Sequence, residues 1–217
     1  MDERVKFLKS ELGTILGPKW RSYLKDANLY TAFSDAQREL SLQTLCVKSK
    51  VELSLDIAEA EYLAGGNVHR IREVLVPEGY QRIEPIEPEN WNATVIEKRL
   101  TGNPQYVTML FGMYTFNPAP VAAFDITLWV ALKPSEDGSD NVSEDYPPIT
   151  PEEYDEELIH GAAYRCLRKI PKDDLVLPEF DSLYYQGLFT AGIVRKAAQL
   201  NRVQNRNPRS MREEYRF

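Results

Sequence analysis

Residues 149–169, ITPEEYDEELIHGAAYRCLRK, decide how the rest of the chain is interpreted. Thr150 and Pro151 are typical of a helix start, because a hydroxyl can accept from free backbone N–H groups and proline suits the first turn. Five carboxylates follow within six residues, and the second half of the stretch is mostly small or apolar. The pattern predicts a helix over residues 152–169. Its acidic opening indicates either chemistry by clustered carboxylates or a surface that faces water or another chain.

Two helices are predicted before the strands begin. The first is short, over residues 2–12, and closes at Gly13. The second spans residues 34–46, because Ser34 and Gln37 have the spacing of a capping box, in which two side chains satisfy free N–H groups at a helix start. Apolar residues recur at helical spacing after Ser34. Residues 19–29 show no clear period.

A last helix is predicted over residues 179–201, where apolar residues fall on one face. Gly187, Ala191 and Gly192 lie within this helix. Their side chains are small enough to let another helix come close.

The period changes to two between the helical regions, which predicts strands with one buried face. Alternation is strictest from Phe124 to Leu132. Gly112 is a possible bend within the strand predicted over residues 105–116. Residues 80–86 are expected to be the hairpin partner of residues 70–76. The strands predicted are residues 51–55, 70–76, 80–86, 105–116 and 122–132, and residues 61–64 are either a sixth short strand or a turn.

The order of helices, strands and helices predicts an α+β fold. The N- and C-terminal helices are expected to pack as a small bundle formed by residues 1–48 and 149–204. An antiparallel β-sheet or sandwich of residues 49–133 is inserted between them. Residues 134–148 form a linker loop, and residues 205–217 form an extended C-terminal arm.

Charge is distributed unevenly along the chain. The formal net charge is −7 and the isoelectric point is near 5.1, which argues against a surface that grips nucleic acid throughout. Residues 140–181 hold twelve acids and four bases, a net charge of −8, whereas residues 195–217 hold seven bases and two acids, a net charge of +5. An acidic block followed by a basic tail suggests a surface that attracts another copy of the chain.

Few residues suggest catalysis. The two histidines, His69 and His160, have no partners at metal-ligand spacing, and no phosphate-binding loop or nucleophile motif is present. Cys46 and Cys166 are far apart in apolar patterns and are expected to be buried free thiols. A run of acids on one side of a helix does not place two carboxylates across a cleft, as glycoside hydrolysis requires. We therefore expect no enzyme, no metal and no cofactor, and we expect a solvated face or a contact surface at the acidic opening.

Three stretches carry a resemblance to a known family. They are LGPKWRSYLKDANLYTAFSDAQRELSLQ at residues 16–43, the stretch at residues 149–169, and EFDSLYYQGLFTAG at residues 179–192. Together with the C-terminal arm, this layout resembles the head-to-tail adaptor, or connector, proteins of tailed bacteriophages. The group includes the tail tubular protein A, or gatekeeper, proteins of short-tailed phages.

The resemblance implies a structural virion protein of the neck or tail that is assembled in the host cytoplasm. Such proteins form a ring, commonly of twelve copies, beneath the portal, where they extend the DNA channel and join it to the tail. The implied partners are further copies of the chain, the portal protein and tail or nozzle proteins. Genomic DNA would pass through the channel without specific binding. No apolar run approaches the ~20 residues of a membrane span, so we expect no membrane partner.

Charge and resemblance together predict the contact residues. The acidic side comprises Glu152, Glu153, Glu156 and Glu157. The basic side comprises Arg202, Arg206, Arg209, Arg212, Tyr215, Arg216 and Phe217. Three alternatives remain open: another tail-completion or baseplate protein, a nucleic-acid-binding module that uses the basic arm with Tyr215 and Phe217 for stacking, and a cofactor-free enzyme with scattered acids.

Overall fold

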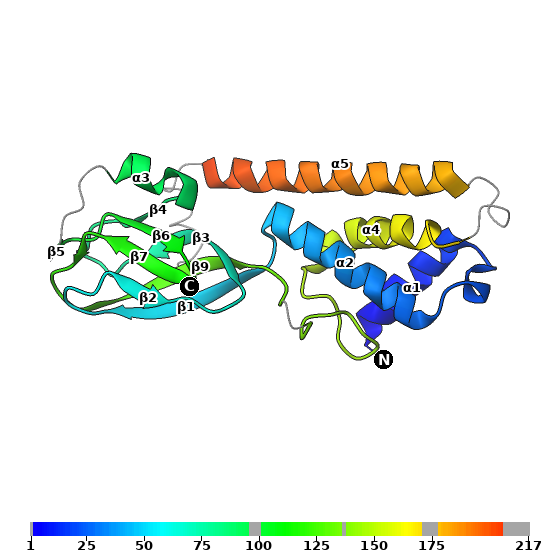
Figure 1. The fold of residues 1–217 in the computed structure, drawn as a ribbon, viewed down its shortest axis with the longest axis horizontal. Coiled ribbons are helices and arrows are strands. Elements are labelled where there is room, and N and C mark those ends of the chain that lie inside the picture. Colours follow the sequence, from blue (N-terminus) through cyan, green and yellow to red (C-terminus); the bar gives the residue numbers. More distant parts are fainter. Residues whose placement is uncertain (1, 96–100, 136–137, 171–177, 206–217) are drawn as a thin grey trace. The chain divides into compact units, whose positions relative to one another are not determined.

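The computed structural model describes residues 2–95, 101–135, 138–170 and 178–205 (Figure 1). The chain divides into two compact units. The helical unit comprises residues 1–46 and 137–217, and the β unit comprises residues 47–136. Helices and sheets are both present in the described residues, which confirms the predicted α+β class.

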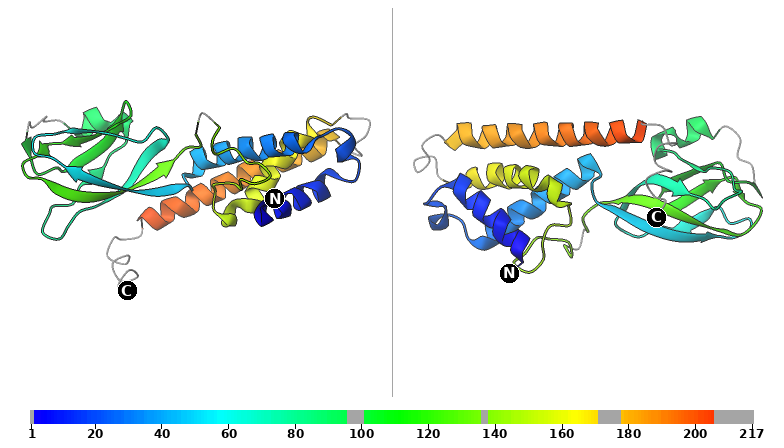
Figure 2. Two further views of the ribbon diagram at one scale, coloured as in Figure 1. Left: turned by 90° about the horizontal axis from the view of Figure 1, so that it is seen from below. Right: turned by 180° about the vertical axis from the view of Figure 1, so that it is seen from behind.

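The helical unit is built around one central helix, α4. This helix contacts α1, α2 and α5, which lie around it (Figures 1 and 2). Gly161 makes this packing close, because a Cβ atom at this position would lie 2.8 Å from the Cβ of Ala36 on α2 and 2.8 Å from Cε2 of Phe189 on α5. The bounds of the helical elements are α1 Glu3–Leu16, η1 Trp20–Ser22, α2 Asp26–Thr44, η3 Glu152–Tyr154, α4 Asp155–Leu167 and α5 Pro178–Asn205.

The first helix, α1, runs past Gly13, where the prediction ended it. It stops at Gly17, whose φ of 77° is a conformation that glycine adopts without strain. Gly13 stays inside the helix because its missing side chain leaves room for Trp20: a Cβ there would lie 3.3 Å from the indole Nε1. Gly13, which the sequence predicts to end the helix, therefore lies inside α1 and allows Trp20 to pack closely against it.

The predicted start of α2 at Ser34 is wrong. The helix begins at Asp26, where Asn28 Oδ1 accepts from the backbone N–H of Lys25 at 2.8 Å. Ser34 lies mid-helix, and its hydroxyl donates to the carbonyl oxygen of Tyr30 at 2.8 Å. A serine hydroxyl can bond the carbonyl four residues earlier, so the capping spacing alone does not place a helix start.

The supposed capping residues instead hold the loop that precedes η3. Gln37 Nε2 donates to the carbonyl oxygen of Asp140 at 2.9 Å, and Gln37 Oε1 accepts from the N–H of Ile149 at 2.7 Å. Ser34 Oγ accepts from the N–H of Val142 at 2.9 Å. Gln37 is buried, and these bonds replace the water it loses. The loop over residues 138–150 is thereby fixed on α2.

The β unit contains two larger sheets and one short strand pair. The first sheet has the order β1-β9-β3 and is antiparallel, with Ile126, Leu128 and Val130 of β9 buried. The second has the order β2-β7-β6-β4, and β5 pairs with β8. The strand bounds are β1 Lys48–Leu55, β2 Glu61–Leu63, β3 Val68–Leu75, β4 Glu84–Pro85, β5 Thr101–Gly102, β6 Tyr106–Leu110, β7 Met113–Asn117, β8 Ala119–Pro120 and β9 Phe124–Leu132, and the short helices are η2 Pro88–Asn90 and α3 Trp91–Thr94.

Two predictions for the β unit are corrected. The stretch at residues 80–86 is not the hairpin partner of β3, because only β4 is a strand there and it pairs in parallel with β6. The β5–β8 pair is parallel as well, so the inserted unit is not wholly antiparallel. Gly112 marks a tight hairpin turn between β6 and β7 rather than a bend, with φ of 50° at Phe111 and 78° at Gly112.

Both cysteines, Cys46 and Cys166, are buried free thiols, as predicted. Burial raises the pKa of Cys46, and it raises the pKa of Cys166 to about 11. None of the described helices combines the length and the apolar character that crossing a bilayer requires.

Candidate interface surfaces

The acidic residues at the start of α4 have different roles, because some stabilise the fold and others are exposed at the surface. Asp155 is part of the fold, because Arg4 of α1 donates to its Oδ1 from Nε at 3.1 Å and to the carbonyl oxygen of Pro148 from Nη1 at 3.0 Å. This pair holds the start of α1 beside the start of α4. Glu152, Glu153 and Glu156 are exposed and remain free to face another molecule.

Glu157 is predicted to be a contact residue of the acidic side together with Glu152, Glu153 and Glu156, but the structure buries it within the helical unit. Its residue exposure is 1%, and its Oε1 accepts from Nη2 of Arg195 on α5 at 3.0 Å. Gly192 of α5 makes room for it, since a Cβ at Gly192 would lie 2.6 Å from Cγ of Glu157. The close approach of α5 at Gly192 therefore buries Glu157, although the helical period of α4 predicts an exposed position for it.

The basic part of α5 already reaches the acidic opening within one chain. Lys196 Nζ donates to the carbonyl oxygen of Glu153 at 2.7 Å and lies 4.8 Å from the ring centroid of Tyr154. The predicted basic contact residue Arg202 belongs to α5. The other predicted contact residues of the arm lie outside the described residues: Arg206, Arg209, Arg212, Tyr215, Arg216 and Phe217.

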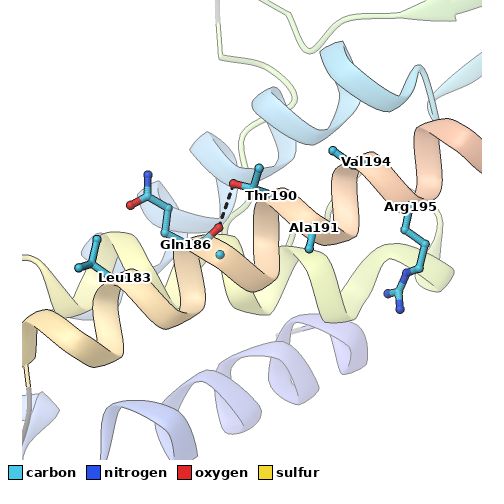
Figure 3. A pocket seen from close by; sticks show the side chains of 7 residues that line it. Leu183, Gln186, Thr190, Ala191, Val194 and Arg195 are labelled. Carbon is cyan, nitrogen blue, oxygen red and sulfur yellow. Dashed lines mark hydrogen bonds between the residues drawn. The ribbon is translucent and has the colours of Figure 1, made fainter.

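An open hollow of about 710 Å³ lies on the outer face of α5 (Figure 3). Leu183 is 66% exposed and Val194 is 63% exposed, and between them a Cβ at Gly187 would meet nothing within 4 Å. The sequence indicates small residues on this helix, but it does not predict which of them pack against the other helices of the unit. Gly192 faces α4, whereas Gly187 faces outward. The lining residues are Leu183, Gln186, Gly187, Thr190, Ala191, Val194 and Arg195.

A second hollow, of about 650 Å³, lies where α1 meets η1 and carries basic side chains. Lys9 Nζ pairs with Asp26 at 2.6 Å, and the guanidinium of Arg21 lies 5.4 Å from the ring centroid of Trp20. The prediction missed this surface, although the bases at residues 19, 21 and 25 without an acid between residues 12 and 25 were a visible signal. The lining residues are Lys6, Lys9, Ser10, Gly13, Thr14, Gly17, Pro18, Trp20 and Arg21.

The β unit presents an apolar tip. Phe111 at the β6–β7 turn is fully exposed, and Leu63 on the neighbouring strand β2 is 84% exposed. No charged residue occurs from residue 100 to residue 124.

Titratable side chains do not gather into a reactive group in the described part of the chain. No cluster of three metal-ligating side chains occurs there. His160 is half-buried with its ring centroid 5.8 Å from that of Tyr185, and burial lowers its pKa. Burial also lowers the pKa of His69 in the β unit.

Comparison with known protein families identifies the family of the chain. The chain matches the model of a family described as SU10 adaptor protein over residues 8–212. Because the match spans nearly the whole chain, the chain belongs to the SU10 adaptor protein family, and the predicted resemblance to phage head-to-tail adaptors is confirmed. The comparison with curated proteins gave no match. Membership places the chain among the structural adaptor proteins of bacteriophages.

Proposed function

We propose that the chain is a head-to-tail adaptor that forms a ring beneath the portal, extends the DNA channel and joins it to the tail. The match to the SU10 adaptor protein family over residues 8–212 is the observation that carries this proposal. In this role the chain works without catalysis, metal or cofactor. It resides in the neck of the virion after assembly in the host cytoplasm.

The distribution of surfaces on the helical unit supports a ring. A ring requires heterologous contacts, in which one face of a copy meets a different face of the next. Exposed acids open α4 at Glu152, Glu153 and Glu156, and bases line the hollow between α1 and η1. The copy number is commonly twelve in such rings. A net charge of −7 suits a channel through which DNA passes without being held.

The C-terminal arm is the proposed docking element. Arg206, Arg209, Arg212 and Arg216 would meet acids on the neighbouring copy or on the portal, and Glu152, Glu153 and Glu156 are candidate acceptors. Exposed ion pairs contribute little free energy, so Tyr215 and Phe217 would supply the buried anchors. A chain ending at Asn205 should unfold thermally like the full chain yet be missing from purified particles. If the shortened chain assembles into infectious particles, the arm is not the docking element.

Labelling locates the chain in the particle. Phe111→Cys places a reactive thiol on a fully exposed turn, and the native thiols of the chain are buried, so a maleimide gold label should attach to this chain at that one position. Wild-type particles treated in the same way are the control for thiols of other virion proteins. Electron microscopy of labelled particles should show gold between head and tail. Gold at the distal end of the tail would favour a baseplate or tail-completion protein instead. Salt-dependent DNA binding by the isolated chain would favour the nucleic-acid-binding module.

A further inference from the structure

We propose that the free chain forms a two-fold pair through the open edge of β1. The β1 strands of the two copies run antiparallel, and Lys50 of each copy faces Glu52 of the other. The pair is a state of the chain before it joins a particle. It goes beyond the proposed adaptor role and does not rest on it.

One long edge of the β unit is open. β1 is an outer strand of the sheet β1-β9-β3 and pairs only with β9 among the described strands (Figure 1). Directly before β1, the carbonyl oxygen of Val47 accepts from the N–H of Leu132 at 2.9 Å. Bonded and non-bonded pairs alternate in an antiparallel ladder, so every second residue of β1 bonds β9 from Ser49 onwards. The remaining residues direct both their N–H and C=O groups to the open edge: Lys48, Lys50, Glu52 and Ser54.

β1 lacks the irregularities that usually protect an outer strand. It runs for eight residues in a regular register and contains no proline. The other outer strand, β3, has register shifts after Val68 and after Ile71, which disturb the row of backbone groups that a further strand needs. A long regular edge is suited to adding a strand, because each new backbone hydrogen bond satisfies one donor and one acceptor.

The charges on β1 select the partner strand. The exposed side chains of β1 are Lys48, Lys50, Glu52 and Ser54. Like charges directly opposite each other destabilise a strand pair, so a partner must offer an acid opposite Lys50 and a base opposite Glu52. A second β1 in antiparallel orientation offers both when the two-fold axis passes through Val51. Lys48 of each copy then faces the uncharged Ser54 of the other.

Backbone and charge agree on this register. Lys50 and Glu52 both direct their backbone groups to the open edge, so they form a hydrogen-bonded pair when they face each other. Shifting one strand by two residues keeps the faces but places Lys50 opposite Lys50 or Glu52 opposite Glu52. On the core side, Val51 is half-buried in one copy and meets Val51 of the second. Each valine is thereby covered by a β-branched side chain, which favours the pair.

The ion pair within one copy becomes part of a larger network. Lys50 Nζ lies 2.7 Å from Oε1 of Glu52, and the two side chains are 51% and 77% exposed. An exposed pair of this kind contributes little by itself. In the two-fold pair each lysine has a carboxylate beside it and another opposite it, so four charges alternate around one network. Such a network contributes more than an isolated exposed pair.

Pairing protects the free chain from uncontrolled association. An open regular edge is a template for further strands and hence for aggregation. A two-fold pair is closed, because both copies use the same edge and cover it completely. Neighbours in a ring are instead related by rotation about the ring axis, and one face of a copy meets a different face of the next. A copy therefore leaves its two-fold pair when it joins a ring.

Charge reversal tests the facing residues in the purified full-length chain. Sedimentation velocity over a range of concentrations should show a dimer of the wild type. Lys50→Glu places a carboxylate opposite Glu52 twice in each pair, so the dissociation constant should rise at least about tenfold. Adding Glu52→Lys to this variant restores opposite charges and should restore the dimer. The matched control is Lys48→Glu, which makes the same change in net charge opposite Ser54 and should have a much smaller effect.

An introduced thiol tests the register. Val51→Cys places two thiols opposite each other across the two-fold axis, in a non-hydrogen-bonded pair whose Cα atoms lie about 4.5 Å apart. This distance suits a disulfide, so mild oxidation should link the two copies. Leu53→Cys is the control, because its two thiols are offset by about four residues, roughly 13 Å along the strands. Cys46 and Cys166 are buried and should not react.

Several results would overturn the inference. They are a wild type that stays monomeric at every concentration, a dimer that Lys50→Glu leaves intact, a reversed pair that fails to restore the dimer, and a Leu53→Cys variant that is linked as readily as Val51→Cys. In each case the adaptor role stands, because it is tested by the presence of the chain in particles. Circular dichroism and thermal unfolding like those of the wild type show that a variant is folded, so a lost dimer then reports the lost contact.

Discussion

Arg195 of α5 pairs with Glu157 of α4, with Nη2 3.0 Å from Oε1, and the two side chains differ sharply in exposure at 58% and 2%. The carboxylate is thus buried between the helices while its partner reaches out to the surface. The other oxygen of Glu157, Oε2, has no hydrogen-bond partner among the described residues. A buried carboxylate held by one exposed arginine makes the helix packing sensitive to that arginine.

Removing the arginine should therefore do more harm than neutralising the acid. We expect Arg195→Ala to lower the free energy of unfolding by about 1–3 kcal/mol, because it leaves a buried charge unpaired. Glu157→Gln removes that charge and keeps an acceptor, so its effect should be smaller. Urea unfolding of both variants measures this, and a larger loss for Glu157→Gln would contradict the assigned roles.

Two glycines in neighbouring helices should respond in opposite directions to alanine. Gly161→Ala forces a Cβ to within 2.8 Å of Ala36 and Phe189, and overpacking of this kind lowers stability by about 1–3 kcal/mol. Gly187→Ala is the matched control, since nothing lies within 4 Å of its added Cβ and alanine favours a helix by about 0.5–1 kcal/mol. Thermal unfolding of the two variants distinguishes them, and equal effects would show that α4 does not pack as closely as described.

Relieving the turn at Phe111 should stabilise the free chain. Its φ of 50° is unfavourable for phenylalanine, and its side chain makes no compensating contact because it is fully exposed. Phe111→Asn should raise the free energy of unfolding by about 1 kcal/mol, because asparagine tolerates this conformation. Phe111→Ala keeps the unfavourable backbone and should give no such gain. Denaturant unfolding tests both, and equal gains would show that φ is not the cause.

Stability should fall as the pH drops through the ordinary histidine range. Burial is the main cause that lowers the pKa of His160 in the folded chain, with Arg195 acting in the same direction and Glu156 and Glu157 opposing it. The unfolded chain therefore takes up the proton first, near pH 6.5, and gains free energy relative to the folded chain below that pH. His160→Gln should lose less stability than the wild type between pH 7.5 and about 5.5. If the wild type and His160→Gln lose the same free energy of unfolding between these two pH values, the prediction is wrong.

Local periodicity located most elements of this fold. The alternation from Phe124 to Leu132 became β9, and the acidic start with its apolar continuation became η3 and α4. The start of α2 was misjudged because Ser34 has alternative partners, the Tyr30 carbonyl and the Val142 N–H, that no local pattern reveals. The spacing of a capping motif carries no information about which loop will compete for its side chains.

The candidate site was predictable only in part. Exposed acids at Glu152, Glu153 and Glu156 followed from their place in the first turns of a helix. The burial of Glu157 did not, because it depends on Gly192 of a helix more than thirty residues away. The hollow around Gly187 is likewise set by which side of α5 the rest of the unit covers.

The most direct test of the adaptor role is in vitro completion of particles that lack the chain. Phage carrying a stop codon early in the gene should yield DNA-filled heads without tails under the electron microscope. Adding the purified full-length chain together with tails should produce tailed, infectious particles. Tailed and infectious particles in the absence of the chain would contradict the account.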